Sequence, residues 1–476
     1  MNNIAENLQK LSTAKTDIAT AIINHGGIVN SNDGFEDFAN CINSIPTGGG
    51  HVVNITTIPN ANIFLTSSLN NYSGLSDNNG LCEIVGVEAG NYTVVVSQND
   101  EVWKTTTLII DNHPVNLQGT TISVTADFDN STLTKSGDIT LNNVYQKMSR
   151  CNVADDGEIL CYYGDTNYTE TGTNGQVMVK IPKFYYKLET TTTNGDAINY
   201  GTWSIIDYPT TGYKLHPAFI NADGNEVDYF LISAFEAVLQ DGDSYVNSSS
   251  SSFLKLASAK GNGTLYPSSV TGSNANTYAQ NRGNHWYNLS FLQFQAVQML
   301  FVVENGFNVS VVGPGVTYSG STRNYAGQTT GNTTTVGTST KQSVNWRGIE
   351  NFWGNYSYML FGFRPSSAKL YFCDNFNFSE TTEYKQIAFN APTTKTADVY
   401  AYRLGYDAIN DWILFPKSIQ SSRYKFLSSN CYLASSATSY DYCGNDSGNG
   451  LFSYGWGGNG GSAYSGGYHG ARLMYV

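Results

Sequence analysis

Residues 347–355 read Arg347-Gly348-Ile349-Glu350-Asn351-Phe352-Trp353-Gly354-Asn355. The Phe and Trp of this stretch offer large apolar area to a protein core, whereas its Arg, Glu and Asn side chains can close a buried hydrogen-bond network. Glycines on both sides permit tight turns. We therefore expect the stretch to form part of the architecture of a large domain, and we favour that interpretation over a catalytic one.

The carboxyl-terminal region has a different composition. Residues 428–476 contain no Lys, Glu or Pro and are rich in Ser, Gly, Tyr and Asn. In binding loops Tyr supplies rigid contact area, while Ser, Gly and Asn supply adaptable hydrogen bonds. The region also contains apolar positions that we expect to pack: Leu451, Phe452, Trp456, Ala471, Leu473 and Met474. These features predict a fixed frame that carries a polar, aromatic recognition surface.

Composition restricts the class of protein. A chain of 476 residues exceeds what one hydrophobic core usually serves, so two or three domains are expected. An aromatic content of 13% argues against disorder, and a formal net charge of -13 opposes nucleic acid as a partner. Charged residues make up only 13% of the chain, below the roughly 25% of ordinary domains. This balance suits an extracellular, mainly β protein better than a cytosolic enzyme.

The cysteines give no sign of a metal site or a disulfide scaffold. There are 7 of them, an odd number, and no two form a C-x-x-C pair. We therefore expect neither metal nor cofactor. Residues 1–10 lack a signal-peptide layout, and no apolar run approaches the roughly 20 residues of a membrane span. A role outside the cell would then require another route, such as assembly on a virus particle and release by lysis.

Residues 1–47 predict a helical anchor or oligomerisation segment. Gly26-Gly27 is a natural stop for a helix. The apolar positions before it line one helix face: Ile4, Leu8, Leu11, Ile18 and Ile22. A second short amphipathic piece contains Phe35, Phe38, Ile42 and Ile45. Because so small an element cannot bury its own apolar stripe, we expect it to self-associate or to attach to a larger assembly. Residues 48–50 are interpreted as a hinge.

Alternating apolar residues and turn signals over residues 51–121 predict a small antiparallel sandwich. Residues 122–145 are interpreted as a connector, and residues 146–476 as one large domain. That domain has strand-like runs at 159–163 and 177–186 and one internal helix at 290–304.

Two resemblances refine this division. The stretch Gly80-Leu81-Cys82-Glu83-Ile84-Val85-Gly86-Val87-Glu88-Ala89-Gly90-Asn91-Tyr92-Thr93-Val94 resembles carboxypeptidase-regulatory-like, immunoglobulin-type repeats, which act as spacers. Further segments match a second family in order and spacing: Arg150-Cys151-Asn152-Val153-Ala154-Asp155-Asp156-Gly157, Gly175-Gln176-Val177-Met178-Val179-Lys180-Ile181-Pro182-Lys183-Phe184-Tyr185-Tyr186, His216-Pro217-Ala218-Phe219, Ser233-Ala234-Phe235-Glu236-Ala237, residues 347–355 and Gly470-Ala471-Arg472-Leu473.

Over residues 140–476 these segments resemble the variable proteins of diversity-generating retroelements and the related tropism-determining tips of phage tail fibres. The resemblance implies a C-type-lectin-like α+β domain of the formylglycine-generating-enzyme subtype. The fold expected for the whole chain is thus multidomain and mainly β: a helical segment, an immunoglobulin-like sandwich and this lectin-like domain. It also implies a homotrimer in the virion tail fibre, joined to other tail proteins by the amino-terminal segment and binding a bacterial surface receptor, protein or glycan.

In that family the variable residues lie at the carboxyl terminus, here residues 428–476, on a constant frame. The frame would be Gly450-Leu451-Phe452, Gly457-Gly458, Gly460-Gly461 and Gly470-Ala471-Arg472-Leu473. The resemblance implies these ligand-binding positions: Asn430, Tyr432, Ser435, Tyr440, Asp441, Tyr442, Asn445, Asp446, Ser453, Tyr454, Trp456, Asn459, Tyr464, Tyr468 and His469. Trp456 is an alternative member of the frame.

Other functions remain open at this stage. A bacterial surface adhesin with the same fold is one alternative. A formylglycine-generating-type oxidase is less favoured, because only Cys431 and Cys443 lie late in the chain and neither segment resembles that active site. A calcium-dependent lectin is disfavoured because no Glu-Pro-Asn or Gln-Pro-Asp triplet occurs. His216 is interpreted as a structural histidine. We expect a binding protein with no catalytic residues.

Overall fold

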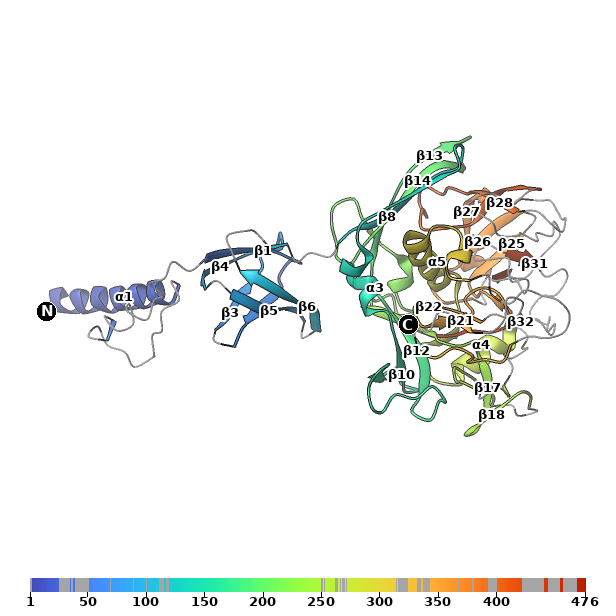
Figure 1. Ribbon diagram of the computed structural model, residues 1–476, viewed down its shortest axis with the longest axis horizontal. Coiled ribbons are helices and arrows are strands. Elements are labelled where there is room, and N and C mark those ends of the chain that lie inside the picture. Colours follow the sequence, from blue (N-terminus) through green and yellow to red (C-terminus); the bar gives the residue numbers. More distant parts are fainter. Residues whose placement is uncertain are drawn as a thin grey trace. The chain divides into compact units, whose positions relative to one another are not determined.

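The computed structural model describes residues 2–24, 35, 37–38, 51–68, 70–88, 90–99, 101–110, 115–116, 120–249, 251, 253–261, 264–265, 267, 270, 272–313, 315, 324–331, 335–336, 343–366, 368–378, 381–392, 400–421, 441–443, 454–456 and 469–476. The chain divides into two compact units, Met1–Gly119 and Thr120–Val476. Both contain mostly antiparallel sheets, so the mainly β class predicted from the sequence is confirmed (Figure 1). Among the described helices, none combines the length and apolarity needed to cross a membrane.

The first unit begins with helix α1 (Asn2–Asn24), as the apolar periodicity predicted. Ile22 is buried and packs with Phe38, whereas Leu11 and Ile18 are 58% and 39% exposed. The predicted stop at residues 26–27 and the hinge at 48–50 lie outside the described residues. Part of the apolar stripe of α1 is therefore left in contact with solvent in a single chain.

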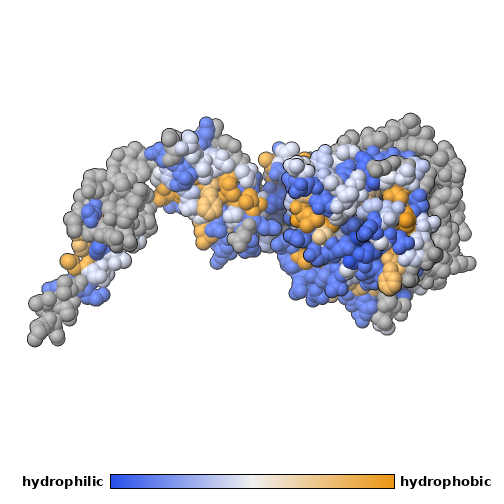
Figure 2. All heavy atoms as spheres, turned by 90° about the horizontal axis from the view of Figure 1, so that it is seen from below, coloured by the Kyte–Doolittle hydropathy of each residue, from blue (hydrophilic) through white to orange (hydrophobic). Residues whose placement is uncertain are grey.

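The remainder of the first unit contains two sheets. Their strands, in sheet order, are β4 (Leu81–Val87), β1 (His51–Thr56) and β7 (Val115–Asn116), and β3 (Asn71–Leu75), β2 (Asn62–Thr66), β5 (Gly90–Gln98) and β6 (Glu101–Ile110). Burial alternates along β2, where Ile63 and Leu65 are buried and Phe64 is exposed, as expected for a half-buried strand. The sheets meet closely at Gly74, where an added Cβ would lie 2.5 Å from the Sγ atom of Cys82. Figure 2 shows apolar side chains gathered on the visible face of this unit.

A six-stranded sheet organises the second unit. Its strands, in sheet order, are β11 (Ile159–Tyr162), β10 (Ser149–Val153), β12 (Gln176–Pro182), β16 (Tyr229–Ser233), β33 (Leu473–Tyr475) and β20 (Trp286–Asn288). Both faces are covered, because Val177 and Val179 of β12 belong to one hydrophobic cluster and Met178 to another. The last strand of the chain lies inside this sheet. The expected packing of Ala471, Leu473 and Met474 is confirmed, since all three are fully buried.

A five-stranded sheet corrects the predicted domain division. Its strands, in sheet order, are β15 (Lys214–Leu215), β13 (Tyr185–Thr193), β14 (Ala197–Ile206), β8 (Ile122–Asp127) and β9 (Thr132–Ser136). The 3-10 helix η1 (Ile139–Leu141) and helix α3 (Asn143–Lys147) follow. The prediction of a connector at 122–145 is wrong, because β8 pairs along six residues of β14 and buries Ile122, Val124 and Ala126 in the core of the second unit.

Helix α5 (Phe291–Asn305) confirms the predicted internal helix. It contacts β8, β14 and the 3-10 helix η2 (Pro217–Phe219), and residues 291–303 are all buried. Two of its buried glutamines have partners in other segments. Gln293 Nε2 donates to Ala218 O at 2.9 Å, and Gln295 Oε1 accepts from Leu414 N at 2.5 Å. Hydrogen bonding thus permits polar residues on a helix that has no solvent face.

The remaining described elements form small sheets and helices around this core: β17 (Val238–Asp241), β18 (Ser244–Val246), β19 (Lys255–Ala257), α4 (Gly272–Gln280), η3 (Val309–Val311), β21 (Thr335–Val336), β22 (Ser343–Trp346), β23 (Ile349–Glu350), β24 (Ser357–Met359), β25 (Phe363–Ser366), β26 (Lys369–Phe372), η4 (Thr381–Glu383), β27 (Lys385–Asn390), β28 (Tyr400–Leu404), β29 (Pro416–Gln420), β30 (Asp441–Cys443), β31 (Tyr454–Trp456) and β32 (His469–Gly470).

Candidate functional site

The stretch 347–355 lies in the core, as predicted. Strands β22 and β23 pair across a two-residue turn in which Arg347 and Gly348 both have positive φ, 49° and 88°. That backbone is typical of tight hairpins and explains the glycine. Phe352 and Trp353 are fully buried, and Trp353 Nε1 donates to Gly313 O at 2.9 Å. The stretch is therefore architecture that supports other segments.

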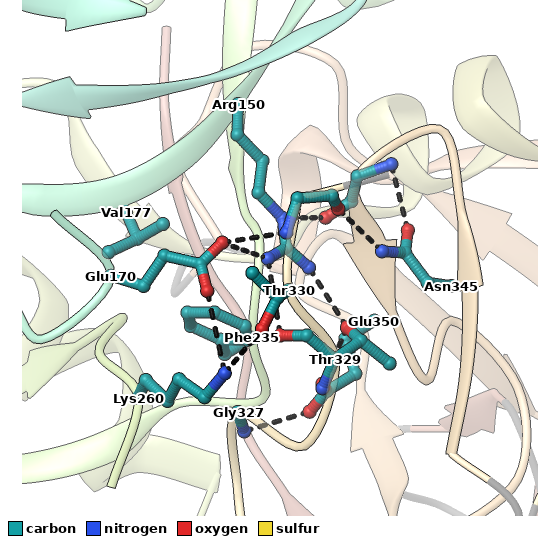
Figure 3. A network of polar contacts seen from close by, with 12 residues as sticks. Arg150, Glu170, Val177, Phe235, Lys260, Gly327, Thr329, Thr330, Asn345 and Glu350 are labelled. Atoms are coloured by element: carbon teal, nitrogen blue, oxygen red, sulfur yellow. Dashed lines mark hydrogen bonds and ion pairs between the residues drawn. The ribbon is translucent and has the colours of Figure 1, made fainter. Parts of the chain in front are cut away.

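A first buried polar network joins this hairpin to the central sheet (Figure 3). The Glu350 carboxylate accepts a hydrogen bond from Thr329 Oγ1 at 2.7 Å, and that hydroxyl accepts one from Arg150 Nη2 at 3.0 Å. Arg150 also donates to Glu170 at 2.6 Å and to Gly348 O at 2.7 Å. Burial raises the pKa of Glu350, and the donors around the carboxylate oppose that shift. The network fixes the hairpin on β10 without exposing a reactive group.

A second network fastens strand β24 to the core. Tyr358, in the middle of β24, is fully buried, and its hydroxyl accepts from Arg472 Nη2 at 2.8 Å and donates to Glu236 Oε1 at 3.3 Å. Glu236 also accepts from Asn351 Nδ2 at 3.1 Å and from the side-chain amide of Asn355. Two segments distant in the sequence, around Glu236 and Arg472, thus converge on β24 together with the stretch that directly precedes it.

The electrostatics of this network are unusual for a buried site. Burial raises the pKa of Glu236 to about 7, although the positive charge of Arg472 and the amide donors of Asn355 and Asn351 pull it down. The Arg472 guanidinium also lies 4.8 Å from the centre of the Tyr358 ring. A carboxylate that changes protonation near neutral pH therefore lies directly beneath β24.

Strand β24 carries the carboxyl-terminal region. It pairs on one side with β30 and on the other with β32, and β30 pairs in turn with β31, which gives a four-stranded sheet. Tyr358 lies opposite Cys443 and Gly470. Gly470 is buried, and an added Cβ would lie 3.2 Å from the Cβ of Tyr356. The described strands of the region rich in Ser, Gly, Tyr and Asn are thus joined through their backbone to β24.

The structure brings some of the predicted binding positions together in this sheet. In register, Asp441 is opposite Trp456, Tyr442 is opposite Met359, and His469 is opposite Ser357. Tyr454 is opposite Cys443. The other predicted positions lie outside the described residues: Asn430, Tyr432, Ser435, Tyr440, Asn445, Asp446, Ser453, Asn459, Tyr464 and Tyr468.

The predicted frame is described in part. Ala471, Arg472 and Leu473 are buried, and Arg472 donates to Ser233 O at 2.8 Å. The frame residues at 450–452, 457–458 and 460–461 lie outside the described residues. Sequence reasoning missed Tyr358, which has no motif around it. Its position three residues after Asn355 is the one signal that tied it to the core stretch.

Within the described part of the chain, no group of three or more His, Cys, Asp and Glu side chains could hold a metal ion. Cys82, Cys151, Cys161 and Cys373 are buried and form no disulfide. Burial raises the pKa of Cys151 to about 12, so this residue stays a neutral thiol. His216 is fully buried with its pKa lowered to about 3 by desolvation, and its Nδ1 accepts from Ala218 N at 3.2 Å. This agrees with a structural histidine.

No protein-family model matches the chain, and no curated protein matches it.

Proposed function

We propose that the chain is a receptor-binding protein whose recognition face is built by residues 428–469 on strand β24. The pairing of β30 and β32 with β24 carries this proposal. It joins a region of paratope-like composition to a strand that Glu236, Arg472 and Asn351 hold from within the core. A surface can change its side chains and keep its shape when its backbone is fixed in this way.

Within this proposal, the second unit is a C-type-lectin-like domain of the diversity-generating retroelement type, and the two sheets of the first unit form an immunoglobulin-like spacer. The exposed apolar positions of α1, Leu11 and Ile18, support an oligomeric anchor, which we propose to be a trimer. Several copies at the tip of a phage tail fibre would raise a modest affinity for a bacterial surface through effective concentration.

The test is a cell-pelleting assay with the fluorescently labelled full chain and a panel of bacterial isolates. The wild type is expected to pellet with some isolates and not others. Tyr442→Ala combined with His469→Ala is expected to reduce pelleting with those isolates at an unchanged melting temperature. Tyr200→Ala, at an exposed site on β14, is the matched control and should pellet like the wild type. Pelleting with no isolate, or equal pelleting of wild type and double variant, contradicts the proposal.

A further inference from the structure

A pocket of about 370 Å³ opens between the end of α4 and strand β20. Its lining includes Asp223, Gln280, Asn284, His285 and Tyr287. This volume is in the range of small-molecule sites, about 300–1,000 Å³. The pocket lies in the second unit and contains none of the residues predicted from the sequence to bind a ligand.

The backbone of the pocket is left-handed at one position. His285 has φ +64°, a conformation that is uncommon outside Gly and in which Asn, Asp and His are enriched among the other residues. The neighbouring contacts hold it there: Val476 N donates to His285 O at 3.2 Å, and Trp286 Nε1 donates to Asp155 O at 2.7 Å. Just before it, the buried Arg282 donates to Leu256 O at 3.0 Å. A residue that its surroundings hold in such a sparsely populated conformation motivates a hypothesis of function at that position.

Several polar side chains of the pocket make few contacts with the rest of the fold. His285 Nε2 lies 3.6 Å from Asp223 Oδ2, and His285 Nδ1 is buried with no hydrogen-bond partner. Gln280 and Asn284 are exposed, and within the described residues their side chains make no hydrogen bond. The pocket therefore presents the Nε2 side of the His285 imidazole, the Asp223 carboxylate and two amides to a ligand.

We propose that this pocket binds a saccharide. Each sugar hydroxyl both donates and accepts a hydrogen bond, which matches the mixed amide, imidazole and carboxylate lining. The ring of the half-buried Tyr287 packs on Phe376 at a centroid distance of 4.9 Å, and sugar C–H groups can pack on the part of the ring that stays exposed. The Asp223 carboxylate would repel an anion. A cation would have this single carboxylate as its only charged ligand in the pocket. An uncharged polyhydroxyl ligand meets neither difficulty.

The site is separate from the β24 sheet. His285 is bonded to Val476, and Figure 1 draws the carboxyl terminus away from β31 and β32 within the second unit. Saccharide binding here does not depend on the proposed function of residues 428–469. A chain that used both sites would have one constant site for sugar in addition to the proposed variable face.

The test is saturation-transfer NMR of the full chain with methyl glycosides of glucose, galactose, mannose and N-acetylglucosamine. At least one glycoside is expected to receive saturation and to bind with a measurable Kd. Asp223→Asn and His285→Gly are each expected to weaken that binding at least about tenfold, since each removes a hydrogen-bonding or charged partner of the ligand. Asp243→Asn makes the same charge change at an exposed position outside the pocket and is expected to bind like the wild type.

The glycine variant separates binding from folding. Because Gly adopts positive φ without strain, His285→Gly is expected to melt no lower than the wild type while binding is weakened. Should His285→Gly fail to fold, Asp223→Asn alone decides the matter. The proposal is overturned if none of the four glycosides receives saturation, or if Asp223→Asn binds as tightly as the wild type.

Discussion

Replacing Glu236 with Gln removes a buried carboxylate whose pKa is raised to about 7. The ordinary value is 4.5, so the folded chain holds this proton more tightly than the unfolded chain. The resulting stabilisation is fully present below pH 4.5 and is lost as the pH rises toward 7. At about 1.36 kcal/mol per pKa unit, the loss over this window is about 3 kcal/mol.

The Glu236→Gln variant cannot titrate and resembles the protonated form of Glu236. Its unfolding free energy, minus that of the wild type, is therefore expected to rise by about 3 kcal/mol between pH 4.5 and 7. Near pH 4.5 the variant should be the less stable chain by about 1–3 kcal/mol. Its amide NH₂ can only donate, and it faces donors from which the carboxyl group accepts hydrogen bonds. The other titrating groups contribute equally to both chains and cancel in the difference.

The assay is denaturant unfolding followed by tryptophan fluorescence at several pH values across this window. Glu158→Gln, at an exposed position, is the matched control and is expected to show no dependence of its difference on pH. A Glu236→Gln difference that stays constant from pH 4.5 to 7 would refute the reasoning, since it would mean that the carboxylate beneath β24 has an ordinary pKa.

Three further outcomes are expected. Trp353→Ala should lower the unfolding free energy of the second unit by about 3–5 kcal/mol, measured by urea unfolding, whereas a loss below 1 kcal/mol would contradict its place in the core. His216→Asn should reduce the loss of stability in acid: the pKa of His216 is lowered to about 3, so its contribution is present above pH 6.5 and is lost as the pH falls toward 3. If His216→Asn and the wild type lose the same amount of melting temperature between pH 6.5 and 3, this prediction is contradicted. Light scattering of the full chain should give the mass of a trimer that Leu11→Asp with Ile18→Asp converts to a monomer, and a monomeric wild type at micromolar concentration would contradict the proposed anchor.

The features predictable from the sequence are those with a strong local signal. The two rings of residues 352–353 predicted a place in the core and the glycine at 348 predicted a tight turn, and the apolar run at 291–303 predicted a buried helix. The apolar residues at 471–474 predicted the packing of the carboxyl terminus. In each case the pattern lies within a few residues of the structure it predicts.

The features that were missed depend on contacts far along the chain. Strand β8 pairs with β14, whose residues follow some 75 positions later. The sequence of residues 122–127 itself does not indicate which strand they pair with. The role of Tyr358 requires Glu236 and Arg472, which lie more than 100 residues away on either side. The pocket at His285 was also missed, because no sequence pattern predicts the positive φ of this residue or the pocket beside it. Pairing and burial over such separations are decided by the whole fold.

The most direct measurement compares two libraries of random substitutions, one at the predicted binding positions between 430 and 469 and one at residues 351–355 and 470–473. The fraction of each library that stays folded would be counted by resistance to protease. We expect most members of the first library to resist digestion like the wild type and most members of the second to be degraded. Equal sensitivity of the two libraries would contradict the claim that a fixed frame carries an exchangeable recognition surface.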